Sequence, residues 1–584
     1  MPRPQLRLAV LTFGAALASL GANLAWADTL TAATTVSAPA APEAAGAYLA
    51  ARLAAKSFDF IAAATWYDRA LEADPKNPTL LEGAATAYLA LGNISVAGDR
   101  ARLLVATGAK SQIAFLAILA ADARAGDFAS ILKNEAAGNT IGTLVDNLVV
   151  AWAEVGTGKM SEALAEFDAI IKTPGMAAFG TYHKALALAS TGDFEGADAL
   201  LSGPAADAVS QLRRGLITRV EVLSQLERDA DAVALIDKTS GTQMDDGIAD
   251  LRRRLVAGET LPFDGARSAT DGLAEVFFTL ATALSDQADD TYILFYTRVA
   301  AALRPDHVEA QLMSARILEK LNQYDLASAA FATVPPTDSA YVTAMIGQAQ
   351  SAISANRLDD AVKLLQTLAT ARPLDIEAQV AVGDALHQQE HCDLAIPAYD
   401  AAIAALGKPE KDNWPLFYKR ANCQLTAGNW PAAEADYRLA LTLDPTEPRL
   451  LNELGYSYVD RGEHLDEALK MIQQAVAESP NTGYIVDSLA WAYFRLGRYA
   501  DAVVPMEKAS LLMPVDPVVT DHLGDVYWAV DRKREAQFQW HRALSYKPED
   551  KDATRIQRKL DVGLDQVLQE EKAAPIAASG TNGD

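Results

Sequence analysis

The sequence predicts an all-α fold, a solenoid or superhelix of roughly 12–14 stacked helix-turn-helix repeats with a C-terminal capping helix. One observation is a set of four prolines spaced 35, 34 and 34 residues apart. Each follows a pair of small or apolar residues and three further positions. A period near 34 is typical of paired helices that bury their apolar faces between neighbouring repeats. The four residues are Pro445, Pro480, Pro514 and Pro548.

A second observation is a core pattern, Leu-Gly/Ala-x-x-Tyr, that recurs in the expected first helices of these repeats. It begins at Leu454, Leu489 and Leu523. Gly or Ala allows adjacent helices to approach closely, while Leu and Tyr fill the space around the contact. We therefore interpret the pattern as core and not as a cofactor-binding motif.

Composition limits the kinds of partner. A chain of 584 residues is too long for one conventional core, but a solenoid buries its core between neighbours and has no such limit. The formal net charge is −25. Phosphate contacts need Lys and Arg, so we expect neither nucleic acid nor an anionic membrane surface as a partner.

The N-terminal residues predict export. Arg3 and Arg7 form a basic start, residues 8–20 an apolar run, and Ala25-Trp26-Ala27 a small-residue cleavage site. This order is typical of a secretory signal peptide. An uncleaved membrane anchor is the alternative, but the run is shorter than the ~20 residues that a span needs. No cysteine near the cleavage site allows lipid attachment, and no later segment is apolar enough to cross a bilayer. We expect an exported, periplasmic mature chain.

Regularly spaced glycines mark the repeats in the first half of the chain. Gly92, Gly126, Gly158 and Gly192 fall 34, 32 and 34 residues apart, where a turn between paired helices needs a positive φ. Alanines follow at the close-packing position of the second helix. The predicted segments are a signal peptide (1–27), a flexible leader (28–46), diverged repeats (47–238), an irregular excursion (239–271), central repeats (272–413), well-matched repeats (414–548), a capping helix (549–572) and a disordered tail (573–584).

The excursion interrupts the rhythm. It contains turn-forming Gly, Asp and Pro residues and a basic run, Arg252-Arg253-Arg254, without a complete helix pair. We interpret it as a long surface segment between two parts of the solenoid. A loop that contacts a partner is the alternative, because long irregular loops in compact chains are often functional.

The sequence contains no catalytic constellation. We find no glycine-rich phosphate loop after a strand, no Gly-x-Ser-x-Gly and no His-Glu-x-x-His. His387, His391 and Cys392 could be drawn as a metal cluster, but no second clustered set accompanies them, and solvated turn residues are the favoured interpretation. We therefore expect no enzyme activity, no cofactor and no metal.

The two cysteines form a candidate pair. Cys392 begins the second helix of one repeat, and Cys423 lies late in the first helix of the next. Because neighbouring helices are antiparallel, the start of one helix lies beside the end of the next, which brings the two cysteines close together. An exported protein also enters an oxidising compartment, where disulfides form. We expect a Cys392–Cys423 disulfide; two separate buried thiols are the alternative.

Candidate partner-binding residues lie on the first helices, which line the inner face of such a solenoid. Aromatic and hydrogen-bonding side chains alternate there, as suits an extended peptide or a helix. Trp491 and Trp528 could instead pack on adjacent repeats. The predicted groove residues are Tyr418, Asn422, Asn452, Tyr456, Asp487, Trp491, Arg495, Asp521, Asp525 and Trp528.

Charge at these positions indicates the kind of partner. Repeat proteins that clamp a terminal carboxylate use Lys and Arg there, whereas this chain has Tyr418, Asn422, Glu453 and Tyr484. A carboxylate clamp is therefore not expected. The acid-rich groove favours a basic or neutral partner.

Several phrases go beyond a generic repeat. They are Leu451-Asn452-x-Leu454-Gly455-Tyr456, Tyr484-Ile485-Val486-Asp487-Ser488-Leu489-x-Trp491-x-Tyr493, Asp521-His522-Leu523-Gly524-Asp525-x-Tyr527-Trp528 and Gln539-Trp540-x-Arg542-Ala543-Leu544. With them the chain resembles long exported bacterial tetratricopeptide-repeat (TPR) proteins. The resemblance implies a periplasmic adaptor that binds a carboxyl-terminal processing protease and delivers cell-wall hydrolases to it. The lipid-attachment cysteine of a similar adaptor is absent here. A structural component of envelope assembly or polysaccharide secretion is the alternative function.

Overall fold

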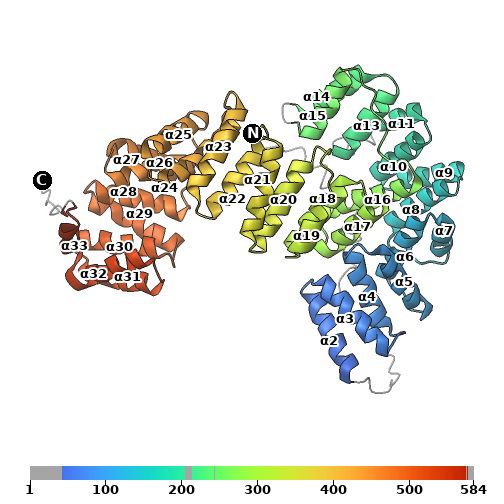
Figure 1. The fold of residues 1–584 in the computed structure, drawn as a ribbon, viewed down its shortest axis with the longest axis horizontal. Helices are drawn as coiled ribbons and strands as arrows, with labels where there is room; N and C mark the ends of the chain where they lie inside the picture. Colours follow the sequence, from blue (N-terminus) through green and yellow to red (C-terminus); the bar gives the residue numbers. More distant parts are fainter. Residues whose placement is uncertain (1–41, 204–212, 242–243, 574, 577–584) are drawn as a thin grey trace. The chain divides into compact units, whose positions relative to one another are not determined.

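A computed structural model describes residues 42–203, 213–241, 244–573 and 575–576 (Figure 1). Over these residues the chain forms 31 α-helices, one short 3-10 helix and no strand, which confirms the all-α prediction. None of the described helices is both long enough and apolar enough to cross a bilayer. The predicted signal peptide (1–27) lies outside the described residues.

The chain divides into two compact units, residues 1–364 (unit 1) and 365–584 (unit 2), and each is described by itself. Thirteen consecutive helix pairs pack as hairpins among the described residues. The hairpins of unit 1 are α2 (Pro42–Lys56) with α3 (Phe60–Ala73), α4 (Pro78–Ala90) with α5 (Ile94–Ala106), α6 (Gln112–Ala125) with α7 (Phe128–Ala136), α8 (Thr143–Gly156) with α9 (Met160–Lys172), α10 (Ala177–Ser190) with α11 (Phe194–Leu201), α13 (Arg213–Gln225) with α14 (Asp229–Ser240), α16 (Ala269–Leu284) with α17 (Asp290–Leu303), and α18 (Val308–Lys320) with α19 (Tyr324–Phe331).

Glycine turns separate the paired helices as predicted. Gly92, Gly126, Gly158 and Gly192 have φ values of 75°, 72°, 80° and 89°, in the left-handed region that costs glycine no steric strain. Side-chain caps begin many of the helices that follow; Asp127, for example, accepts a hydrogen bond from the Ser130 backbone N–H. The predicted close-packing alanines are fully buried, among them Ala97, Ala163, Ala197, Ala327, Ala361 and Ala395.

Helices α16 and α17 do not simply extend the stack. Helix α16 contacts α6, α8 and α10, and α17 contacts α4 and α6, so the pair covers the first helices of earlier hairpins (Figure 1). Gly272 of α16 lies so close to the Trp152 ring of α8 that an added Cβ would be 2.2 Å from it. Arg298 of α17 donates to the Ala90 carbonyl, 208 residues away. The first helices of these hairpins are therefore occupied by the chain itself.

The predicted irregular excursion is half helical. Helix α15 (Asp246–Val256) packs against α14 and contributes Ile248 and Leu255 to a small core. The basic run lies on this helix, where Arg252 pairs with Asp237 at 2.7 Å and Arg254 pairs with Glu259. These arginines serve contacts within unit 1. Residues 257–268 form the non-helical part before α16.

Unit 2 contains the best-matched repeats. Several consecutive first helices contact each other: α22 with α24, α26 with α28, and α28 with α30. Helix α20 (Tyr341–Ser354) lies in unit 1, and α21 (Leu358–Ala371) spans the unit boundary. The helices of unit 2 are α22 (Ile376–Gln388), α23 (Cys392–Leu406), η2 (Lys411–Asn413), α24 (Trp414–Thr426), α25 (Trp430–Leu443), α26 (Pro448–Arg461), α27 (Leu465–Glu478), α28 (Gly483–Arg495), α29 (Tyr499–Leu512), α30 (Pro517–Ala529), α31 (Lys533–Ser545), α32 (Asp550–Val562) and α33 (Leu564–Glu570).

The core pattern of unit 2 acts as the sequence predicts. A Cβ added at Gly455 would lie 2.7 Å from the Ile472 side chain, and one at Gly524 would lie 2.4 Å from the Trp540 ring. Tyr458 is fully buried. The predicted single capping helix is two helices, α32 and α33, joined at Gly563, whose φ of 84° breaks the first helix.

Candidate functional site

The ten predicted groove residues all lie on the first helices α24, α26, α28 and α30, and we call this surface the first-helix face. These residues differ in how much of their surface is exposed to solvent. Asn452, Asp487 and Asp525 are buried, at 3%, 6% and 1% exposure, so these three face the interior of the solenoid. Arg495 is exposed. The half-buried members are Tyr418, Asn422, Tyr456, Trp491, Asp521 and Trp528.

Tyr418 and Asn422 lie one turn apart on α24. The Tyr437 hydroxyl donates a 2.6 Å hydrogen bond to Asn422, and its ring centroid is 6.2 Å from that of Tyr418. The ring of Trp414 packs edge-on against the ring of Tyr418, with their centroids 5.9 Å apart. These contacts hold both predicted residues in fixed positions with part of their surface accessible.

Glu453 on α26 is not among the predicted binding residues, yet it is half-buried and its charge acts on residues of this surface. Burial raises the pKa of its carboxyl. Burial raises the pKa values of tyrosines on four helices, Tyr418 and Tyr437 among them, and the charge of Glu453 raises them further. No ion pair to Glu453 occurs among the described residues. A half-buried carboxylate with aromatic neighbours suits a cationic ligand.

Trp491 makes internal contacts. Its ring stacks on His522 at 4.0 Å and on Phe494 at 4.8 Å. His522 Nδ1 lies 3.1 Å from both carboxylate oxygens of Asp487. Burial alone would lower the pKa of His522, but Asp487 outweighs it and raises that pKa above the ordinary value. Much of the Trp491 ring therefore packs within the solenoid, as in the alternative given above.

The capping helix occupies the acidic C-terminal end of the first-helix face. Lys559 of α32 is fully buried and donates to both carboxylates, at 2.7–2.8 Å for Asp521 and for Asp525. Asp525 also accepts a 2.9 Å hydrogen bond from Trp540. Burial, and then the charge of Asp525, raise the pKa of Asp521. Both aspartates are thus engaged within the chain.

The last two predicted residues are also tied to their surroundings. Trp528 donates through Nε1 to Asp565 of α33 at 2.8 Å. Arg495 donates to the Asp460 carbonyl at 3.2 Å and is an exposed residue. Accessible aromatic surface therefore concentrates on α24, α26 and α28.

A sequence signal for the Lys559 contact exists. Lys559 follows Asp525 by 34 residues, the repeat period, so α32 presents a lysine at the position where a further first helix would carry its groove residue. Arg555 has the same relation to Asp521, and its guanidinium lies 3.6 Å from Asp525. Extending the repeat register past Pro548 would have found both.

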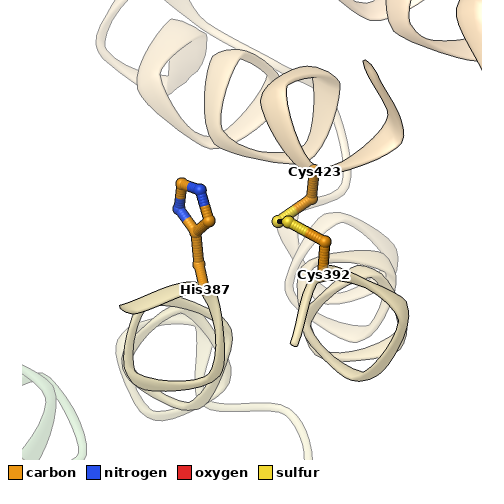
Figure 2. A group of neighbouring side chains, drawn as sticks. All are labelled: His387, Cys392 and Cys423. Atoms are coloured by element: carbon orange, nitrogen blue, oxygen red, sulfur yellow. Dashed lines mark hydrogen bonds between the residues drawn. The ribbon is translucent and has the colours of Figure 1, made fainter. Parts of the chain in front are cut away.

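The cysteines lie together, as the sequence analysis expected. Figure 2 shows Cys392 of α23, Cys423 of α24 and His387 of α22 around one point. The sulfur atoms are 2.7 Å apart, and the ligand atoms of all three residues lie within 4.8 Å of one another. His387 was interpreted as a solvated turn residue; the structure places it half-buried beside both sulfurs. The disulfide itself stays a prediction.

Unit 1 contains a buried polar network with a structural role. Glu275 of α16 accepts hydrogen bonds from Tyr182 and Arg214, both at 2.9 Å, and lies 3.3 Å from His307. Burial would raise the pKa of Glu275, but Arg214 and His307 outweigh it and hold the pKa below its ordinary value. Each oxygen of the carboxylate has partners, so the network joins helices and leaves no open site.

Residues 346–408 and 403–548 match two models of the tetratricopeptide repeat. Together with the stacked hairpins, these matches identify the fold as a TPR solenoid. Proteins built from this repeat are generally non-catalytic scaffolds that bind other proteins.

The chain is similar to a TPR repeat-containing protein of Pseudomonas aeruginosa, with 26% identity over 196 residues. The match covers 33% of this chain and 32% of the relative, so the chain spans about a third of the length of the protein it matches.

Solved structures with a similar helical arrangement include the APC/C hetero-tetramer Cut9–Hcn1, with 17% identity, a TM-score of 0.37, and 90% of this chain and 97% of that chain covered. A TPR protein from Parabacteroides merdae has 15% identity and a TM-score of 0.36 and covers 44% of this chain and 98% of its own. The TM-scores are below 0.5, so the argument for the fold rests on the repeats themselves.

Proposed function

We propose that this chain is a non-enzymatic scaffold whose first-helix face binds a basic or neutral segment of another protein. The observation that carries the proposal is the half-buried Glu453, whose charge acts on several tyrosines and which has no ion pair among the described residues. Tyr418, Tyr456 and Tyr484 leave aromatic surface accessible beside it. A lysine or arginine of a partner would gain both a charge-assisted hydrogen bond and cation–π contacts there.

The capping helix offers an internal precedent. At the C-terminal end of the same face, a lysine of the chain's own α32 occupies the two aspartates of α30. The Lys559 ammonium also lies 5.8 Å from the centroid of the Trp540 ring. Acidic groups on this face, together with the Trp540 ring of the adjacent helix α31, thus accept a basic side chain of the chain itself, which supports the same kind of ligand at Glu453.

The proposal also covers the cellular compartment in which the chain acts and the proteins that it binds. The signal-peptide pattern at residues 1–27 supports an exported chain that acts in the periplasm. The resemblance to exported TPR proteins supports an adaptor that holds a carboxyl-terminal processing protease and presents cell-wall hydrolases to it. A solenoid with long accessible helices suits this task because it can bind two proteins along one surface.

Affinity capture from the producing organism tests the proposal. The full-length chain, tagged at its C-terminus, is isolated from an envelope extract, and bound proteins are identified by mass spectrometry. The adaptor role predicts recovery of a processing protease or a cell-wall hydrolase. An eluate that lacks both would reject that role, and loss of a surface polymer on deletion would favour a structural part in secretion.

Matched variants locate the binding surface. Glu453→Gln and Tyr484→Ala should each lower partner recovery at least about fivefold, since hot-spot residues cost more than about 1 kcal/mol on truncation. Phe538→Ala is the control, because Phe538 is 67% exposed on α31, a second helix. Trp491 and Trp528 are poorer choices because their substitution removes internal contacts. Equal recovery with all variants would move the site off the first-helix face.

A further inference from the structure

Three helices of unit 2 converge on a pair of thiols. Cys392 is the first residue of α23, and Cys423 lies late in α24; they are 5% and 0% exposed. Their sulfur atoms are 2.7 Å apart, closer than two non-bonded sulfurs normally approach. A covalent S–S bond measures about 2.0 Å, so the two atoms need to move together by less than about 1 Å.

We propose that Cys392 and Cys423 form a reversible disulfide that joins α23 to α24, with His387 as the proton acceptor for its formation. Formation of this bond does not require the partner protein proposed above. It would covalently connect two successive repeats at the start of the well-matched block. Figure 2 shows His387 facing the same space as the two sulfurs, from the adjacent helix α22.

The chemistry balances with a disulfide-bearing oxidant such as glutathione disulfide. The His387 imidazole takes the proton of the Cys392 thiol, and the thiolate attacks one sulfur of the oxidant and releases the first small thiol. Cys423 then attacks the Cys392 sulfur of the mixed disulfide and, giving up its proton, releases the second. Two protein thiols are oxidised, one small disulfide is reduced to two thiols, and two electrons pass to the oxidant.

The surroundings assign the two cysteines different parts. Burial, and then the neighbouring Cys392, raise the pKa of the Cys423 thiol, so Cys423 stays protonated until a partner sulfur is in place. Cys392 has the larger exposed fraction and lies at a helix N-terminus, where negative charge is favoured. Cys392 is therefore the sulfur that meets the oxidant.

The same three residues could instead hold a soft metal ion such as zinc. Structural zinc takes four ligands, and only three lie within reach among the described residues. Asp384, an acidic residue whose charge acts on Cys423, already accepts hydrogen bonds from Tyr399 at 2.9 Å and Lys419 at 2.6 Å. The close approach of the two sulfurs also leaves no space for an ion between them. The observations favour the disulfide.

The test uses the full-length protein, fully reduced and then incubated with glutathione disulfide. Samples are unfolded without reductant, treated with a maleimide and weighed as intact chains. The proposal predicts that both thiols become unreactive with the loss of two hydrogen atoms in mass, and that dithiothreitol restores both. His387→Gln should slow the reaction about tenfold or more and leave its end point unchanged.

Controls separate the other outcomes. Cys392→Ser should keep one reactive thiol, and its circular dichroism shows whether the variant folds. His391→Gln, at the neighbouring exposed residue, should react at the unaltered rate. Two reactive thiols after exposure to the oxidant would overturn the proposal. So would protection of both thiols by zinc alone, reversed by a chelator, in a protein that the oxidant leaves unchanged.

Discussion

Replacement of Lys559 by methionine tests the role of the capping helix. The change removes one buried ammonium and leaves Asp521 and Asp525 close together without their principal cation. Removal of one partner from a buried ion pair costs about 3–5 kcal/mol, mostly because the remaining charge is uncompensated. Methionine has a similar length and apolar volume, so lost packing contributes little. We expect the local unfolding free energy of α30–α33 to fall by about 3–5 kcal/mol.

Native-state hydrogen exchange with mass spectrometry measures this quantity on the intact chain. Peptides from α30 and α32 should exchange about 100-fold faster or more in Lys559→Met, since 1.4 kcal/mol corresponds to a factor of ten. Peptides of unit 1 should be unaffected. Lys551→Met is the matched control, because Lys551 lies on the exposed surface of the same helix.

A further variant separates charge from packing. Adding Asp521→Asn and Asp525→Asn to Lys559→Met removes the uncompensated carboxylates and should restore much of the lost protection. Exchange in Lys559→Met equal to that in Lys551→Met would refute the reasoning. It would mean that the aspartates find other counter-charges, such as the nearby Arg555, at no cost.

Three further predictions concern unit 1. Burial raises the pKa of Glu221 to about 7, so the folded state loses stability as pH rises from about 4.5 to 7. Glu221→Gln should therefore stabilise by up to about 3 kcal/mol at pH 8 and little at pH 4, as measured by urea unfolding. Burial lowers the pKa of His183 to about 4, so stability should fall between pH 6.5 and 4, with a shallower slope of melting temperature in His183→Gln. Gly272→Ala should cost about 1–3 kcal/mol in thermal unfolding by crowding its neighbouring ring. Gly46→Ala, in helix α2 with nothing within 4 Å, should instead stabilise by up to about 1 kcal/mol.

The hairpins could be predicted because the repeat is encoded locally. A residue of positive φ at most turns, a glycine at Gly126 and an asparagine at Asn322, and an alanine at most close contacts, as at Ala163, are needed whatever lies further away. The packing of α16 on α6, α8 and α10 has no such local signal. The 34-residue period describes contacts between neighbours and says nothing of a hairpin that packs on helices far back in the chain.

The sequence predicts which helices carry the candidate binding residues, but it does not predict which of these residues are accessible. Repeat register correctly placed the ten residues on four first helices. Whether a residue is accessible depends on what the next helices bring to it: His522 covers Trp491, and Lys559 covers Asp525. In the sequence, Glu453 is only a reason against a carboxylate clamp, because the tyrosines on which its charge acts come from four separate helices.

The packing of α17 on α4 has a consequence for biosynthesis. Most repeat arrays can fold one hairpin at a time as the chain emerges, because each needs only its neighbour. Here the Ala90 carbonyl has no hydrogen bond from Arg298 until α17 has been synthesised. Until then the apolar surface that α17 covers on α4 and α6 is exposed to solvent. Long-range contacts of this kind slow folding and expose aggregation-prone surface meanwhile. Nascent chains that end before Leu303 should therefore need chaperones, and the finished N-terminal unit should melt as a single block.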